Sequence, residues 1–248
     1  MDENRVAEVI WQARQQGLVL PAPSTQGHPF TLSAAYRIQR AVTALRLAAG
    51  ERVVGWKLGY TSAVMREQMG IDQPNYGPLT DVMALDSGAV APSFLRQPRV
   101  EPEVALVMLD EVRTGVDDLA GRVEARASLE VVDSSWSDYQ FDLGDNTADS
   151  SSAGAYVLGE RLPMDDPAGV SVRLEVTDQD EQVGTADAAM GNPLAALAWL
   201  LNQLAEPLPA GSVVLTGGLT RAIPLEAGGT ARAVFTAGDR TAEVTLTR

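Results

Sequence analysis

Glu101 and Glu103 stand two residues apart at the point where an apolar strand begins. The run that follows, Val104–Leu109, has the composition of a buried strand, and the two-residue repeat of a strand places both carboxylates on one face. Two acids side by side at the edge of a core repel each other, so they are either solvated or bridged by positive charge. A hard divalent cation with oxygen ligands would bridge them, and a solvated strand end is the alternative.

Glu130 is a third acid, and it lies inside the apolar run Leu129–Val132. An unpaired carboxylate in such a strand would be costly. Three carboxylates on two strands leave coordination positions open for water and substrate, which is the arrangement that Mg²⁺ and Mn²⁺ prefer. The three glutamates together therefore favour a metal site over a solvated strand end.

Lys57 is the only lysine of the chain, and the other 18 of its 19 cationic residues are arginines. It lies in a short strand-like run between Gly55 and Gly59. A desolvated lysine can lose its proton, whereas an arginine in practice cannot. Lys57 therefore fits a general acid or base, or an anchor for a carboxylate, and the alternative is a surface cation at a strand end.

Three other segments have functional and structural interpretations. The only histidine, His28, lies in a polar loop-like run, so acid–base chemistry is left to Lys, Asp, Glu, Tyr or water. Thr216-Gly217-Gly218 would offer a hydroxyl and open backbone amides to an anion, although a turn is the commoner interpretation. The run Phe141–Gly154 is too polar for a core and is expected to form either a loop that walls a site or a plain surface loop.

Composition limits what the protein does. A length of 248 residues allows one large domain or two small ones, and the absence of cysteine excludes disulfides, thiolate chemistry and iron–sulfur ligation. The net charge of −14 argues against nucleic acid and anionic membranes, because both need a cationic face. The start of the chain has acids where a signal peptide has bases, and no apolar run is long enough for a membrane span. We expect a soluble, cytoplasmic protein.

The elements that position these residues are predicted from periodicity and punctuation. Two amphipathic helices precede Gly17 and Gly50, a strand follows near 52–58, and a helix is expected between Ser62 and Gly70. Strand-like runs then dominate, at 104–109, 129–132, 155–158, 170–176, 213–215, 231–235 and 242–246, interrupted by helices near 116–127 and 193–205. The change of texture predicts an N-terminal α/β part over 1–80 and a β-rich core over 81–248.

Taken in order, several motifs resemble the 2-keto-4-pentenoate hydratase and 4-oxalocrotonate decarboxylase family of the fumarylacetoacetate hydrolase superfamily. The resemblance covers most of the chain, and the order and spacing of the motifs carry it, since each alone would be weak. They are Tyr36–Gln39, Gly55–Ser62, Gln68–Gly70, Gln73–Gly77, Arg99–Glu103, Leu129–Ser134, Ala148-Asp149 and Leu215–Gly218.

The resemblance implies an α+β fold with a mixed β-roll core of the fumarylacetoacetate hydrolase type and the smaller N-terminal α/β part. It implies Mg²⁺ or Mn²⁺ bound by the positions of Glu101, Glu103 and Glu130, and an essential lysine at Lys57. Aromatic catabolism and a homo-oligomer, with a partner enzyme of the same family as an option, are also implied. Substrate-binding positions fall on Leu58, Thr61, Asn75, Asp149, Ser150, Ser151 and Thr216.

The chain departs from the family pattern at several places. Asn75 stands where hydratases of the family commonly have Asp, and an amide cannot act as a base. The segment after Ala148 reads Asp-Ser-Ser-Ser instead of Asp-Asn-Ala-Ser, Asn192 replaces a frequent His, and the glycine-rich C-terminal signature is absent. By contrast, Tyr139–Leu143 and Thr216–Gly218 are more similar to the decarboxylase branch.

We therefore predict a metal-dependent carbon lyase acting on a small 2-oxo acid or its dienol. The loss of the acid at Asn75 favours decarboxylation of 2-oxo-3-hexenedioate (4-oxalocrotonate), because that reaction needs only an electron sink. The alternatives are a hydratase of 2-hydroxypenta-2,4-dienoate, which needs a positioned base, and another oxo-acid lyase, isomerase or C–C hydrolase. A non-enzymatic alternative is a catalytically eroded partner subunit of a hydratase–decarboxylase complex.

Overall fold

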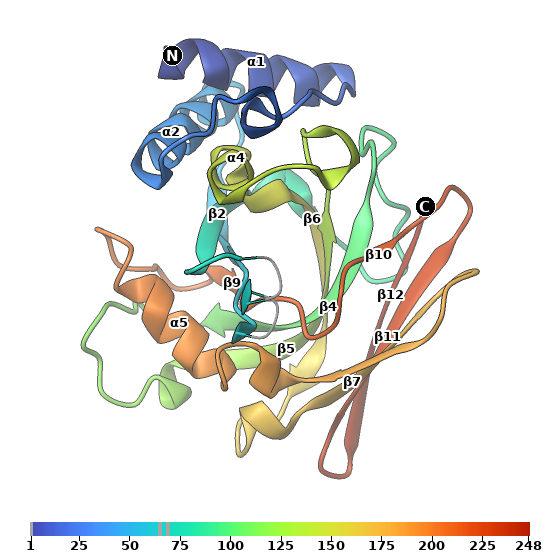
Figure 1. Ribbon diagram of the computed structural model, residues 1–248. Helices are drawn as coiled ribbons and strands as arrows, with labels where there is room; N and C mark the ends of the chain where they lie inside the picture. The colour runs from blue at the N-terminus through green and yellow to red at the C-terminus, as the bar shows by residue number, and fades with distance from the viewer. Residues whose placement is uncertain (1, 64–65, 68–69) are drawn as a thin grey trace.

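The computed structural model describes residues 2–63, 66–67 and 70–248, which form two β-sheets with helices at their margins (Figure 1). In the described part of the chain, no helix is long and apolar enough to cross a bilayer. Short 3-10 turns link the elements at Pro23–Gln26, Asp81–Met83, Ala120–Arg122, Ser137–Tyr139, Ser150–Ser152, Pro167–Gly169 and Ala186–Ala188.

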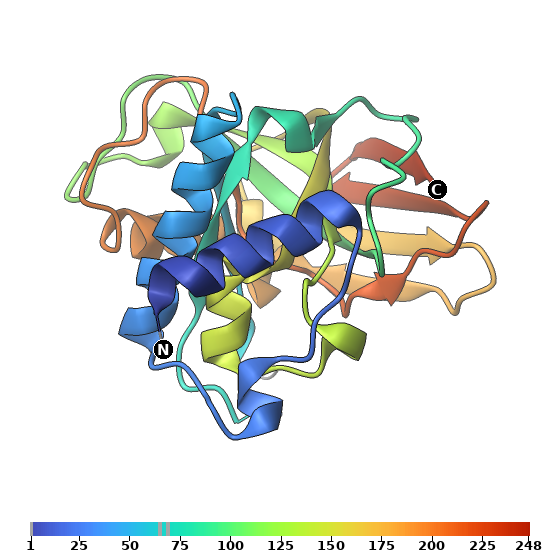
Figure 2. The same ribbon diagram turned by 90° about the horizontal axis from the view of Figure 1, so that it is seen from above.

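The two N-terminal helices form where the amphipathic pattern predicts them. Helix α1 spans Glu3–Gln16, with the Asp2 carboxylate capping its first turn and Gly17 ending it at φ 65°, a left-handed conformation that glycine adopts easily. Helix α2 spans Leu32–Ala48. The two helices cross each other above the large sheet (Figure 2), and their apolar faces pack together with Trp136 and Ala148.

The larger sheet supplies the frame of the site. Its strand order is β2-β1-β9-β4-β5-β6-β3, with β10 paired to the outer part of β4. The strands are β1 Val53–Gly59, β2 Asn75–Thr80, β3 Ala84–Leu85, β4 Arg99–Met108, β5 Val123–Val132, β6 Ala153–Leu162, β9 Val213–Leu215 and β10 Ile223–Pro224. Most neighbours are antiparallel, but β1–β9 and β3–β6 are parallel, so the sheet is mixed. The short strand β9 lies between β1 and β4 and joins the N-terminal strands to the central ones.

The second sheet has the order β12-β11-β7-β8 and is antiparallel throughout. Its strands are β7 Ser171–Val176, β8 Gln182–Thr185, β11 Thr230–Ala237 and β12 Arg240–Thr247. Strand β12 packs against β5 and β6 of the larger sheet, and the alternating apolar residues of β11, including Phe235, face that junction. The apolar cluster between the two sheets is the main core of the molecule.

Two predictions from the sequence are wrong. The expected helix at 116–127 is a 3-10 turn followed by β5, which starts at Val123, because cross-strand pairing with β4 overrides the helical pattern. The segment 141–154 is largely buried and contains helix α4, Leu143–Ala148, followed by a 3-10 turn at Ser150–Ser152, so the alternative of a plain surface loop is wrong, whereas four of its residues do line a cavity, as the alternative of a site wall predicts. Its polar side chains are buried because they find hydrogen-bond partners inside the protein.

Two other predicted helices have different outcomes. Helix α5, Pro193–Leu201, begins at the predicted proline with Asn192 as its cap. The helix expected between Ser62 and Gly70 includes residues 64–65 and 68–69, which lie outside the described residues. Strands β1 and β2 belong to the same sheet as β4 and β5, so a division at residue 80 would separate β1 from its paired neighbour β9, and the division stays a prediction.

Candidate active site

The three glutamates meet on adjacent strands, as the strand period predicts. Glu101 of β4 lies directly opposite Glu130 of β5 in the antiparallel register, and Glu103 follows two residues along on the same face. The Glu103 and Glu130 side chains are 0% and 1% exposed, so neither is solvated at a strand end. Like charges at opposed positions destabilise a sheet unless something compensates them.

Lys57 supplies one compensating charge from strand β1. Its ammonium Nζ lies 3.1 Å from Glu130 Oε2 and donates a hydrogen bond of 3.0 Å to the Ser151 carbonyl. The residue is 4% exposed, which excludes the alternative of a surface cation. One ammonium against three carboxylates leaves this cluster with excess negative charge when all four groups are ionised.

Burial and mutual repulsion shift the acidities of these groups. Removal from water, together with the charge of Glu130, raises the pKa of Glu101 to about 7 and the pKa of Glu103 well above its ordinary value. Burial also raises the pKa of Glu130, against the opposing effect of Lys57. For Lys57, burial alone would lower the pKa, but the three carboxylates outweigh it and raise the pKa above its usual value.

The chemistry of this cluster fits a divalent cation. Within the described residues, Glu103 Oε1 and Glu130 Oε1 are buried with neither a hydrogen-bond partner nor an ion pair, a costly state that a hard cation with oxygen ligands would relieve. Among the described residues, no three His, Asp or Glu side chains stand in a preformed metal-ligand geometry. The carboxylates instead turn toward protein donors: Glu130 toward Lys57, and Glu103 Oε2 toward the Gly217 amide at 2.7 Å.

The glycines of the 216–218 segment allow close approach to this cluster. Gly217 has φ 112°, and a Cβ there would lie 1.9 Å from Thr61 Oγ1. A Cβ on Gly218 would lie 1.8 Å from Glu101 Oε2. The Gly217 amide donates to Glu103 Oε2, and the Thr216 hydroxyl donates 2.8 Å to the Val104 carbonyl. Both groups are thus engaged within the protein, in contrast to the predicted open groups for an anion.

A cavity of 510 Å³ opens beside the cluster. Of the site residues predicted from the sequence, it is lined by Lys57, Leu58, Thr61, Glu101 and Ser151. Six other predicted residues do not appear in its wall: Asn75, Glu103, Glu130, Asp149, Ser150 and Thr216. Glu103 and Glu130 lie behind two residues of the wall, because Glu130 is opposite Glu101 and 3.1 Å from Lys57, and Glu103 follows Glu101 by two residues on β4.

Asn75 is buried behind the cavity wall and its amide is fully engaged. Its Nδ2 donates to Asn146 Oδ1 and Thr147 Oγ1, both at 2.9 Å, and its Oδ1 accepts from the Ser151 hydroxyl at 3.0 Å. Ser151 in turn presents its carbonyl to Lys57. Asn75 therefore supports the group that orients Lys57.

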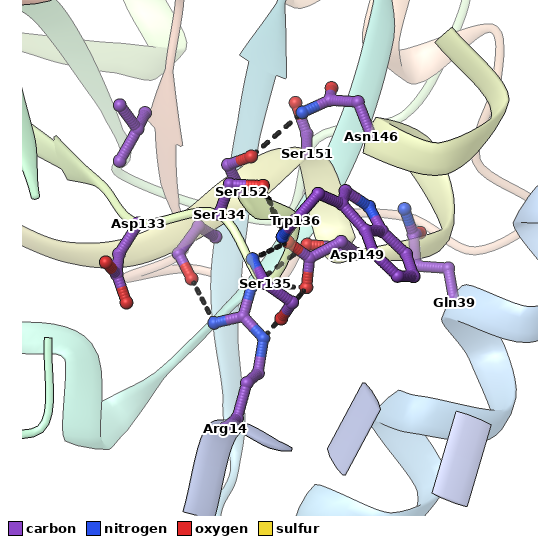
Figure 3. Close-up of polar contacts among 12 residues, drawn as sticks. Arg14, Gln39, Asp133, Ser134, Ser135, Trp136, Asn146, Asp149, Ser151 and Ser152 are labelled. Carbon is purple, nitrogen blue, oxygen red and sulfur yellow. Dashed lines mark hydrogen bonds and ion pairs between the residues drawn. The ribbon is translucent and has the colours of Figure 1, made fainter. Parts of the chain in front are cut away.

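Asp149 lies on the other side of the same wall. Its carboxylate accepts 2.8 and 3.0 Å hydrogen bonds from the Arg14 guanidinium of α1 and 2.6 Å bonds from the Ser135 amide and hydroxyl (Figure 3). All these groups are buried or nearly so. The structure thus gives Asp149 a place in a network that joins α1 to the site wall, and we propose that it supports the site without contacting substrate.

The turn between α4 and β6 is strained. Ser150, Ser151 and Ser152 all have positive φ, between 54° and 57°, a region that costs a non-glycine residue free energy. Hydrogen bonds from the Lys57 ammonium to the Ser151 carbonyl and from the Asn146 amide to the Ser152 hydroxyl hold the turn (the second is drawn in Figure 3). The Ser150 hydroxyl is buried without a partner.

The cavity wall also contains residues that were not predicted from the sequence to belong to the site, among them Tyr60, Arg99, Tyr139 and Arg221. Arg99 could have been predicted from the strand pattern, because it precedes Glu101 by two residues and therefore lies on the same face of β4. The Arg99 guanidinium lies 4.1 Å over the Tyr139 ring. Nothing in the sequence around Arg221 signalled that it would reach this cavity.

Comparisons with known proteins agree with this fold. The fumarylacetoacetate (FAA) hydrolase C-terminal family matches residues 53–247. A 2-keto-4-pentenoate hydratase of Burkholderia vietnamiensis is 40% identical, over 92% of this chain and 93% of its own length. A 2-hydroxyhexa-2,4-dienoate hydratase of Comamonas testosteroni is 34% identical, over 84% of each chain.

A solved structure is similar over nearly the whole molecule. The 4-oxalocrotonate decarboxylase from Pseudomonas putida G7, complexed with magnesium and adipate, has a TM-score of 0.88 and 26% identity, over 99% of this chain and 96% of its own. The similarity confirms the expected α+β fold, with a curled mixed sheet and a small N-terminal helical part.

Proposed function

Because the chain belongs to the fumarylacetoacetate hydrolase family, we propose that the cluster of Lys57 and the three glutamates is the active site of a divalent-metal-dependent lyase acting on a small 2-oxo acid or its dienol. The observation that carries the proposal is the pair of buried oxygens, Glu103 Oε1 and Glu130 Oε1, that have no partner among the described residues and lie beside the only lysine and an open cavity. Magnesium in the 4-oxalocrotonate decarboxylase structure supports a divalent ion at these residues.

We assign hydration of a 2-hydroxy-2,4-dienoate as the leading reaction. Decarboxylation, which the sequence alone favoured, is the less supported reaction, because the similar proteins at 34% to 40% identity are named hydratases. Decarboxylation of 2-oxo-3-hexenedioate stays the second candidate, favoured by Asn75, whose amide is hydrogen-bonded on both sides and cannot act as a base.

Glu101, Glu103 and Glu130 would hold the cation, which would supply charge stabilisation to the C1 carboxylate and the 2-oxygen of the substrate. Lys57 projects an ammonium group into the same cavity, held by Glu130 and the Ser151 carbonyl. In the hydration, the enol hydroxyl gives up its proton, C3 and C5 each gain one, and the hydroxyl group of water joins C4. Since Asn75 is excluded and the three glutamates would bind the cation, Lys57 is the titratable group of the predicted set that lines the cavity for these proton transfers.

The test compares two substrates in ultraviolet absorbance assays with purified protein and Mg²⁺ or Mn²⁺. We expect the absorbance of 2-hydroxypenta-2,4-dienoate to decrease with time. The decrease should stop when EDTA is added and should be absent with the Lys57→Met variant. Turnover of 2-oxo-3-hexenedioate alone would transfer the assignment to decarboxylation.

Absence of turnover with either compound would contradict the proposal for both reactions. Calorimetric titration with Mg²⁺ then addresses the eroded-subunit alternative, since tight binding lost in Glu103→Gln would show a retained metal site without either activity. If Mg²⁺ produces no heat of binding with the unaltered protein, the proposal of a metal-dependent enzyme is refuted.

A further inference from the structure

Two arginines line the active-site cavity without a carboxylate partner. Within the described residues, 12 of the 18 arginines form ion pairs of 4.0 Å or less, and Arg99 and Arg221 are the two cavity-lining arginines among the six that form none. The protein has 33 acidic residues and a net charge of −14. Cations left unpaired in the cavity of such an acidic protein are available to an anionic ligand.

Both arginines lie next to the carboxylate cluster. The segment 219–224 runs antiparallel beside the start of β4: the Leu219 amide donates to the Pro102 carbonyl at 3.0 Å, and Ile223 and Pro224 pair with Val100 and Arg99. Arg99 also precedes Glu101 by two residues on β4, a separation of about 7 Å along a strand. This separation is comparable with the span of an extended six- or seven-carbon diacid.

The donors of both guanidinium groups are free to bind. The guanidinium of Arg99 stacks its flat face on the Tyr139 ring, which leaves the N–H groups in the guanidinium plane available. Arg221 is exposed, and its Nε donates 3.1 Å to Gln182 Oε1. In the described chain this is its one side-chain hydrogen bond, so the Nη edge is open for a bidentate contact with a carboxylate.

We propose that Arg221, assisted by Arg99, binds a second carboxylate at the far end of the substrate, so that the enzyme prefers dicarboxylic 2-hydroxy-2,4-dienoates over monocarboxylic ones. This inference rests on the proposed function, because it assumes that the C1 end of the substrate lies at the glutamate cluster. The acidic protein would repel a dianion elsewhere, and the two arginines provide local attraction in the cavity.

The kinetic test uses two substrates that differ only in the distal group, 2-hydroxyhepta-2,4-diene-1,7-dioate and 2-hydroxyhepta-2,4-dienoate. We expect the unaltered enzyme to favour the diacid in kcat/KM, and Arg221→Gln to lower kcat/KM for the diacid by about tenfold while leaving the monoacid within twofold. The expected loss is at the low end for a charged hydrogen bond because Arg221 is exposed. Arg221→Lys should retain part of the preference, and Arg99→Gln should reduce it as well.

A matched control removes an exposed arginine elsewhere. Arg240→Gln, in the β11–β12 hairpin outside the cavity wall, should leave both substrates unaffected. An equal loss on both substrates in Arg221→Gln, or no loss on either, would overturn the inference while leaving the proposed function intact.

A binding measurement covers the case in which neither dienoate reacts, which would count against the proposed function. Calorimetry with Mg²⁺ present compares adipate with hexanoate, which lacks the second carboxylate. We expect adipate to bind at least tenfold more tightly to the unaltered protein, and Arg221→Gln to remove most of that difference. Equal binding of the two acids to the unaltered protein would refute the role of the arginines whatever the reaction proves to be.

Discussion

Replacing Lys57 with methionine should destabilise the metal-free protein in a way that depends on pH. Methionine keeps the length of the side chain but removes the ammonium that lies 3.1 Å from Glu130 Oε2. Because Lys57 and Glu130 are 4% and 1% exposed, solvent cannot take over the compensation. Removing one partner of such a buried pair costs about 3–5 kcal/mol when the remaining carboxylate stays charged.

The variant can avoid part of this loss by protonating Glu130. From the ordinary carboxyl pKa of 4.5, proton uptake costs about 1.4 kcal/mol for each pH unit above that value. The expected loss in the free energy of unfolding is therefore limited to about 1.4 kcal/mol at pH 5.5, and it rises to the full range of about 3–5 kcal/mol at pH 8.

Urea unfolding of both proteins at pH 5.5 and pH 8, with EDTA present, measures the difference. The double variant Lys57→Met/Glu130→Gln removes the stranded charge and should regain most of the loss at pH 8, while Arg240→Met controls for removing an exposed cation. A loss that does not change with pH, or a double variant no more stable than Lys57→Met, would refute the ion-pair reasoning.

Four further outcomes follow from the site. Glu103→Gln should abolish metal-dependent turnover and the heat of Mg²⁺ binding, whereas His28→Ala, which alters an exposed loop residue, should change kcat/KM less than twofold in the same assays. Since burial raises the pKa of Glu101 to about 7, protons compete with the metal below that pH, so the increase in melting temperature on adding Mg²⁺ should be larger at pH 8 than at pH 5.5. Without metal, the raised pKa means that Glu101 binds a proton in the folded protein at pH values where it has released that proton in the unfolded chain. The contribution of Glu101 to the free energy of unfolding is therefore lost as the pH rises through about 7, and an increase in that free energy over this range would contradict the shift. Asp149→Asn should lower the free energy of unfolding by about 3 kcal/mol by stranding Arg14, and a loss below about 1 kcal/mol in urea unfolding would show that this buried pair does not fasten α1.

Local periodicity was sufficient to predict the centre of the site. The two-residue repeat places Glu101 and Glu103 on one face. The position of Glu130 in a second apolar strand predicts a third ligand, and the strand register places Glu130 opposite Glu101. The single lysine was identified by its rarity, and the structure places it beside Glu130. Whether these four residues perform the roles predicted for them is left to the experiments above.

The predictions that failed depended on contacts distant in sequence. The run at 141–154 has the composition of a loop, yet Asp149 is buried because Arg14 reaches it from α1, 135 residues earlier in the chain. Asn146 is likewise buried because it bonds with Asn75 and Ser152. Composition treats such residues as solvated, because their partners are known only once the fold has brought them together. The same limit hid Arg221, whose place in the cavity depends on β10 pairing with β4.

The position of β9 has a consequence for the order in which the protein is assembled during synthesis. In this three-residue strand Val213 pairs with Gly55 of β1 on one side and with Val107 of β4 on the other, so among the described strands β1 reaches the central part of the sheet through a segment late in the chain. While a ribosome is still translating the residues before β9, β1, which carries Lys57, has no ladder to β4 and β5, which carry the glutamates. We therefore expect the catalytic groups to meet late, after most of the polypeptide has emerged, and pairings between such distant segments to make folding slow compared with helical proteins of this size.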